Sequence, residues 1–108
     1  MIADFRTIPE VEKPHFKGGE GSMFSHEKVT EAGKFMLNRL PKGATIGMHT
    51  HTEDKEIIYV LSGTGKAIIN GLEETIYPGD CHFCPAGSSH TVINTGDEDL
   101  VFFAAVVH

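Results

Sequence analysis

The stretch that decides the fold is GATIGMHTHTEDKEIIYVLSG, residues 43–63. It places His49 and His51 two residues apart, follows them with acidic residues, and continues into an apolar run. In a strand, residues i and i+2 project to the same side with Cα atoms about 6.5 Å apart, so both histidines can reach one ion. Two histidines on one face are also common as plain polar surface, so a metal site needs further ligands.

Candidate partners for the histidine pair follow in the sequence. Carboxylates stand at Glu53, Asp54 and Glu56. A third histidine, His90, comes directly after CPAGSS, a turn-forming stretch that can aim it inward. Four or more groups of the right chemical type are therefore present within one half of the chain.

Length and charge limit the classes of protein that this chain can represent. The 108 residues fit one domain, and the apolar and charged shares, 40% and 22%, are those of a globular protein. The formal net charge is −6 and lysines and arginines form no cluster, which argues against a nucleic-acid partner. The N-terminal stretch has an acid at Asp4 and no continuous apolar run, so we expect no membrane span, no secretory signal and a cytoplasmic location.

Short segments rich in β-branched and aromatic residues, closed by turn-forming residues, predict an all-β domain. The clearest expected strands are 23–29, 34–40, 66–70, 72–77, 91–94 and 100–107. The first two fit a hairpin with Gly33 in its turn, and a short helix over 26–32 is the alternative. Asn70 and Gly71 tolerate the left-handed angles of a type I′ turn and predict the second hairpin. The last strand is apolar on both faces and should lie deep inside.

The segment 56–61 is also apolar on both faces, because Ile58 and Val60 alternate with Ile57, Tyr59 and Leu61. A single barrel does not easily bury both faces of such a strand. We therefore expect its outer face to contact a second subunit in a homodimer, the commonest oligomer.

The N-terminal part of the chain differs from the rest. Residues 1–22 include the glycine-rich FKGGEGS and predict an extended arm, and residues 23–108 form the β domain. No repeat, long linker or second domain is evident.

The positions of the histidines carry a resemblance to the cupin superfamily. The first cupin motif has glycine, His-x-His, glutamate and glycine at set spacings, and the second has glycine, proline, glycine, histidine and asparagine. In this chain the corresponding residues are Gly43, His49, His51, Glu56 and Gly63, followed by Gly79, Pro85, Gly87, His90 and Asn94. Together the motifs cover residues 43–94, about half of the chain.

The resemblance implies a double-stranded β-helix, or jelly roll, with a divalent metal ion inside the barrel, the structure also called RmlC-like. It implies His49, His51, Glu56 and His90 as the metal ligands. Three neutral imidazoles and one carboxylate leave a divalent ion with net charge +1, and an octahedral ion keeps two positions open. This ligand set suits iron, manganese, zinc, nickel or copper without separating them, and we expect iron or manganese.

The family pattern and strict strand alternation disagree on the carboxylate. Alternation would place Glu53, two residues after His51, on the ligand face. The segment TEDK has no strand pattern, so we expect the alternation to break there and Glu56 to begin the next strand.

Other residues capable of chemistry receive plainer interpretations. Cys81 and Cys84 are separated by an odd number of positions, so a strand sends them to opposite faces and we expect them to be structural. His82 shares a face with Cys84 and is either a buried, hydrogen-bonded histidine or a pocket-lining one. Tyr59 and His82 are remote candidates for an acid or base, and no catalytic residue is assigned.

Two functions agree with this sequence. One is an enzyme in which the ion activates a small polar or anionic molecule, with dioxygenase, isomerase or decarboxylase chemistry. The alternative is a metal-dependent small-molecule binding or sensor module without catalysis, because a fold alone does not settle function.

Overall fold

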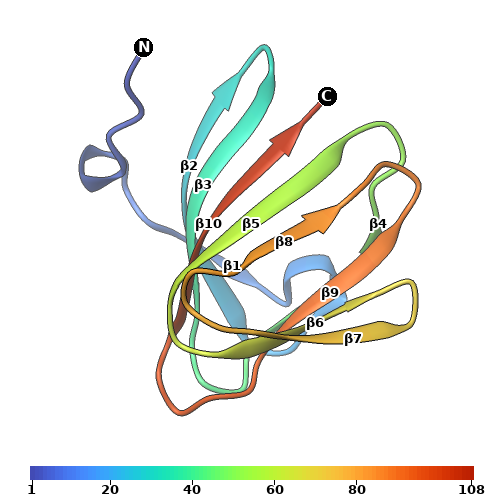
Figure 1. Cartoon of the computed structure of the whole chain (residues 1–108). Coiled ribbons are helices and arrows are strands. Elements are labelled where there is room, and N and C mark those ends of the chain that lie inside the picture. Colours follow the sequence, from blue (N-terminus) through green and yellow to red (C-terminus); the bar gives the residue numbers. More distant parts are fainter.

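Ten strands form two antiparallel sheets that pack face to face, as Figure 1 shows. The computed structural model describes all 108 residues. The six-stranded sheet has the order β1-β2-β3-β10-β5-β8, with bounds β1 Val11–Pro14, β2 Ser22–Thr30, β3 Gly33–Leu40, β10 Leu100–Val107, β5 Lys55–Ser62 and β8 Cys81–Cys84. The four-stranded sheet has the order β4-β9-β6-β7, with bounds β4 Thr45–Thr50, β9 Ser89–Asn94, β6 Gly65–Ile69 and β7 Leu72–Ile76. From β3 onward the chain crosses between the sheets at every connection except the β6–β7 hairpin, which is the winding of a jelly roll.

The predicted hairpins are confirmed. β2 pairs with β3 around Gly33, and the alternative helix over 26–32 is wrong. β6 pairs with β7 through Asn70 and Gly71, whose φ angles of 48° and 84° are those that a type I′ turn requires. β10 lies between β3 and β5 in the middle of the larger sheet, as its apolar sequence predicts.

The inner face of the larger sheet is built in layers, because strand register places side chains of β3, β10 and β5 side by side. At one end, Leu100 lies opposite Leu40, and both are fully buried. At the other end, Val106 lies opposite both Lys34 and Glu56. The barrel is therefore apolar at one end and polar at the other.

Much of the segment 1–22 contacts the barrel, and the expected extended arm is not confirmed. β1 pairs with β2 at the sheet edge, and the Arg39 guanidinium donates two hydrogen bonds to the Glu10 carboxylate, at 2.9 and 3.0 Å. The 3₁₀ turn η2 (Phe16–Gly18) packs on β4, and a second turn, η1, covers Phe5–Thr7. The division of the chain at residue 22 stays a prediction.

The outer face of β5 is exposed, as its double apolar pattern predicts. Ile57, Tyr59 and Leu61 are 38%, 43% and 48% exposed, while Ile58 and Val60 on the inner face are fully buried. The helical elements are two 3₁₀ turns, so the chain has no helix long and apolar enough to cross a membrane.

The contact of η2 with β4 gives the first prediction. A Cβ atom at Gly47 would stand 2.0 Å from the carbonyl oxygen of Lys17, so Gly47→Ala must push η2 away from β4. We expect the free energy of unfolding in urea to fall by about 1–3 kcal/mol. Met48→Ala, one residue along the same strand at an exposed position, is the control and should change it by less than about 0.5 kcal/mol. Equal losses in the two variants would contradict the close contact.

Candidate metal centre

Three imidazoles and one carboxylate converge inside the barrel. They belong to His49 on β4, His51 just after it, Glu56 on β5 and His90 on β9, and their ligand atoms all lie within 4.8 Å of one another. We call these four residues the His3Glu centre. Glu53 lies outside this group, in the exposed loop between β4 and β5.

A β-bulge in β4 aims His49 inward. Ile46 lies opposite Val92 and His49 lies opposite His90, so β4 has one residue more than β9 between these two pairs. Without the extra residue, Ile46 and His49 would face opposite sides of the sheet. With it, both side chains line the same cavity.

The loop that follows β4 breaks the strand alternation, as predicted. The chain bends at Thr52 and Glu53, and β5 begins at Lys55, which places Glu56 on the inner face. Asp54, at the end of the loop, turns back toward His51. The loop therefore carries His51, a candidate ligand, and Asp54, the carboxylate that contacts the His51 ring.

Oxygen acceptors fix the protonation of the first two histidines. His49 Nδ1 lies 2.8 Å from the carbonyl oxygen of Gly47, and His51 Nδ1 lies 2.8 Å from Asp54 Oδ1. Carbonyl and ionised carboxylate oxygens only accept, so each Nδ1 carries the proton and donates it. In the neutral rings, Nε2 then presents a bare lone pair.

A longer hydrogen-bond chain fixes His90. His82 Nδ1 donates to Glu74 Oε1 at 3.0 Å, which leaves His82 Nε2 as an acceptor. His90 Nδ1 donates to that nitrogen at 3.0 Å, and the two rings stack with centroids 5.2 Å apart. His82 is therefore a buried, hydrogen-bonded histidine located directly behind a candidate ligand.

The consequence is a cluster of acceptors without a donor between them. His90 Nε2 lies 3.1 Å from both His49 Nε2 and His51 Nε2, and 3.0 Å from Glu56 Oε1. Neighbouring ligands of an octahedral ion, each about 2.1 Å from it, stand about 3.0 Å apart. Four lone pairs at these separations repel one another unless a cation lies among them, so the residues fit a divalent metal ion.

Burial and neighbouring charges set the protonation states of the groups in the centre. Burial acts to raise the pKa of Glu56, but any proton that the imidazoles carry on Nε2 when no metal ion is bound is donated to its oxygen and holds that pKa far below its usual range, so the carboxylate stays ionised. Burial lowers the pKa of His90 and favours its neutral ring, although Glu56 opposes this effect. When His51 carries a proton on Nε2 as well, the hydrogen bond from that proton to Glu56 raises the pKa of His51, against the effect of burial, so a proton competes with a metal ion at this ring.

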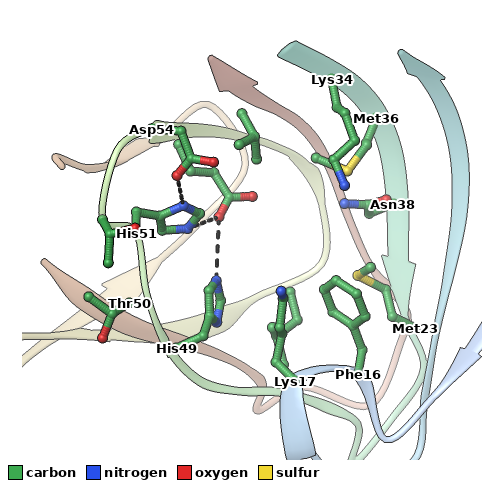
Figure 2. A pocket seen from close by; sticks show the side chains of 14 residues that line it. Phe16, Lys17, Met23, Lys34, Met36, Asn38, His49, Thr50, His51 and Asp54 are labelled. Atoms are coloured by element: carbon green, nitrogen blue, oxygen red, sulfur yellow. Dashed lines mark hydrogen bonds and ion pairs between the residues drawn. The ribbon is translucent and has the colours of Figure 1, made fainter. Parts of the chain in front are cut away.

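A cavity of about 240 Å³ adjoins the centre. Its volume corresponds to about eight water molecules at their liquid volume, which suits a small molecule. Figure 2 shows two groups of side chains facing each other across it, with His49, His51 and Asp54 on one side and Lys34 and Asn38 on the other. The site can therefore hold an ion and a small ligand together.

Other residues that the sequence singled out lie elsewhere. Cys81 is exposed and Cys84 is buried, which confirms that they face opposite sides, and they form no disulfide. Burial, with the charges of Glu56 and Asp54, raises the pKa of the Cys84 thiol to about 11. Tyr59 lies on the outer face, so its interpretation as an acid or base beside the metal is wrong.

Sequence reasoning did not identify Glu74 as part of this site. The signal was present in the second hairpin, where alternation places Glu74 on the same face as Ile76, a core residue. That Glu74 reaches His82 depends on the approach of β7 to β8, which belong to different sheets. A sequence pattern does not encode that approach.

The series of hydrogen bonds from His90 through His82 to Glu74 gives the second prediction. Glu74→Ala removes the acceptor that orients His82, so His90 loses its fixed tautomer, and metal affinity at pH 7 should fall about 10- to 100-fold. Competition with a chelating indicator dye measures this change. Glu73→Ala, which removes the same charge from the next residue of β7 and breaks only the surface pair with Lys66, should leave affinity within about twofold. Similar metal affinities in Glu74→Ala and Glu73→Ala would contradict a role of this series of hydrogen bonds in orienting His90.

Comparison with known proteins agrees with this geometry. A family model described as Cupin domain matches residues 36–106. The oxalate-binding protein of Thermotoga maritima is 38% identical over 99 residues, which are 86% of this chain and 82% of that protein. The crystal structure of a predicted oxalate decarboxylase from Thermotoga maritima has a TM-score of 0.93 and 31% identity, covering 99% of this chain and 98% of that chain.

A more distant relative shares the fold alone. The sugar phosphate isomerase of the cupin superfamily from Silicibacter pomeroyi has a TM-score of 0.81 at 22% identity, and the match covers 100% of this chain and 76% of that one. The expected jelly-roll barrel is thus confirmed by strand topology and by likeness to solved structures. From the family match and the close relatives, we conclude that this chain belongs to the cupin superfamily.

Proposed function

We propose that this protein binds a small carboxylate anion, with oxalate as the first candidate, at a divalent metal ion held by the His3Glu centre. The observation that carries the proposal is the convergence of three imidazole nitrogens and the Glu56 carboxylate beside a small cavity. The name of the 38% identical relative, an oxalate-binding protein, supports the choice of ligand.

The charge of the centre agrees with an anionic ligand. A divalent ion with one carboxylate ligand has net charge +1, and four protein ligands leave two octahedral positions for the oxygen atoms of a carboxylate. When bound, the ion would supply Lewis-acid polarisation of the carboxylate. Iron or manganese is our first candidate for the ion, and zinc, nickel and copper are alternatives that this donor set accepts equally, so elemental analysis must separate them.

A catalytic role is the second candidate. The structure with 31% identity is described as a predicted oxalate decarboxylase, which favours decarboxylation over dioxygenase or isomerase chemistry. Oxalate monoanion would yield formate and carbon dioxide, so a proton must reach the carbon atom that loses carbon dioxide. Lys17 and Lys34 line the cavity and are the available donors, because Asp54 is engaged with His51. Formate release from metal-loaded protein tests this role directly.

The third prediction concerns ligand binding. Calorimetric titration with oxalate should show binding to the manganese-loaded protein and none to the chelator-treated protein. His49→Ala and Glu56→Gln should each lower metal affinity by more than about 100-fold and abolish oxalate binding, because they remove a ligand or its charge. Glu53→Gln, the matched control in the exposed loop, should retain both. Oxalate binding of equal strength with and without metal would overturn the proposal.

We also propose a homodimer formed through the outer apolar patch, which consists of Ile57, Tyr59, Leu61 and Phe83. Ile57 lies opposite Phe83 in the register of β5 and β8, so these side chains form one continuous surface. All four are between 38% and 49% exposed, and contiguous apolar patches of this kind commonly mark subunit contacts.

The fourth prediction tests this patch. Phe83→Glu places a charge within the patch and should convert a dimer to a monomer in light scattering after gel filtration. Leu72→Glu, at a more exposed apolar position on the other sheet, should remain dimeric. A monomeric unmodified protein at micromolar concentration would exclude the dimer.

A cytoplasmic location is the remaining part of the proposal. Both thiols are free, and an exposed free thiol such as Cys81 is compatible with a reducing compartment.

A further inference from the structure

We propose that Lys17, Lys34 and Asn38 form a second anion-binding wall, opposite the His3Glu centre, which holds the distal carboxylate of a short dicarboxylate. The inference rests on the proposed function and extends it by naming the ligand class, a dianion with a carboxylate at each end. Figure 2 shows the nitrogen ends of Lys34 and Asn38 facing the cavity from the side opposite His51, while the Lys17 side chain enters the cavity between His49 and Phe16.

Asn38 is a polar side chain in an apolar layer of the core. It is 2% exposed, and its register neighbour Phe102 lies in line with Val60, both fully buried. Asn38 Oδ1 has no hydrogen-bond partner, and neither has Oγ of Ser25, its cross-strand neighbour on β2. An unpartnered buried polar group costs about 1–3 kcal/mol, and no side chain or backbone group of the protein holds the Asn38 amide. Asn38 lines the cavity, whereas Ser25 does not, so the Asn38 Nδ2–H groups are free to donate to a carboxylate, and its Oδ1 can accept only from a donor such as water.

The other buried asparagine of the barrel shows the contrast. Asn94 Nδ2 donates to the carbonyl oxygens of Leu40 and Glu98 at 2.8 Å, and its Oδ1 accepts from the Gly96 amide at 2.9 Å. Its amide is thus satisfied by the protein alone. Asn38 lines the cavity and has no such partners.

Lys17 is held over the cavity at an energetic cost. Its backbone is left-handed, with φ 56° and ψ 27°, a conformation that costs a residue with a Cβ atom about 1–2 kcal/mol. The close backbone contacts of Gly19 and Gly47 fix the turn that carries it against β4, the strand of His49. Lys17 forms no ion pair with any carboxylate of the chain, so its charge is available to a ligand.

The charges around the cavity match a dianion. Lys34 Nζ lies 3.4 Å from Glu27 Oε1, and the same oxygen lies 3.3 Å from Nζ of Lys13. Three lysines thus balance the three carboxylates of Glu27, Asp54 and Glu56. A divalent ion then leaves the cavity with a charge of about +2, which two carboxylate groups neutralise.

Apolar side chains line the cavity beside its polar groups. They include those of Phe16, Met23, Met36 and Val106. Such a lining accommodates the carbon chain of a small acid while the polar groups bind its two ends. A monocarboxylate would leave the cationic wall without an anion.

Calorimetry with the manganese-loaded protein tests this wall. Oxalate, malonate and succinate are compared with acetate, propionate and butyrate, the monocarboxylates of equal carbon number. The best dicarboxylate should bind at least about tenfold more tightly than its matched monocarboxylate. Lys17→Met and Lys34→Met should each reduce this ratio about tenfold, because each removes a charge-assisted hydrogen bond, and should change monocarboxylate affinity by less than about twofold.

Two further variants separate binding from structural roles. Lys42→Met removes the same charge from a surface pair with Asp97 and should leave the ratio unchanged. Asn38→Leu should raise the urea midpoint, since it replaces an unpartnered amide with an apolar side chain, and at the same time lower the ratio. If the ratio of dicarboxylate to monocarboxylate affinity is unchanged in Lys17→Met, Lys34→Met and Asn38→Leu, the metal alone selects dicarboxylates. That result would overturn the proposed anion-binding wall. Absence of binding by every acid, mono- or dicarboxylate, would instead overturn the proposed function and this inference with it.

Discussion

The structure of the site depends on one constraint: the outward-facing nitrogen of every imidazole in the His3Glu centre already donates to a fixed acceptor. A backbone carbonyl accepts the hydrogen bond from His49, and a carboxylate accepts that from His51. The acceptor for His90 is a second histidine, which itself donates to a carboxylate. Each Nε2 is therefore an acceptor, and the three point at one another and at an ionised carboxylate. Such an arrangement is unfavourable in a folded protein unless a cation occupies it. The outer hydrogen bonds thus determine the chemistry of the inner atoms.

The barrel meets this constraint by drawing the four residues from both sheets. His49 and His90 lie opposite each other on β4 and β9, and Glu56 comes from β5 in the facing sheet. The bulge in β4 and the bends before β5 each interrupt strand alternation once, at the points where a regular strand would aim a side chain outward. Gly47 has two tasks in this region, because its carbonyl orients His49 and its missing side chain lets η2 approach.

The parts of the fold that sequence predicts are those determined by local chemistry. The Asn70–Gly71 turn and the apolar run of β10 depend on residues close in the chain, and the motif spacing identified the four residues that the structure brings together. The partners that lie outside the motifs were not predictable in this way. Glu74 meets His82 only because two strands of different sheets approach each other. The sequence of the N-terminal residues suggested an extended arm because β1 is short and mostly exposed. Its pairing depends on the free edge of β2, which is formed by residues distant from its own.

The layered interior explains how one small barrel tolerates so many polar groups. Along β5, Glu56 at the open end is followed by Ile58 and Val60, and along β9, His90 is followed by Val92. In both strands the ligand residue lies at the open end, and the apolar residues follow toward the closed end. A domain of this size has a net stability of about 5–15 kcal/mol, and each unpartnered buried polar group lowers it by about 1–3 kcal/mol. The apolar end offsets that loss by burying its side chains completely. Ligand-binding groups can then extend down to the layer of Asn38 but not to that of Leu40, where the core must remain closed.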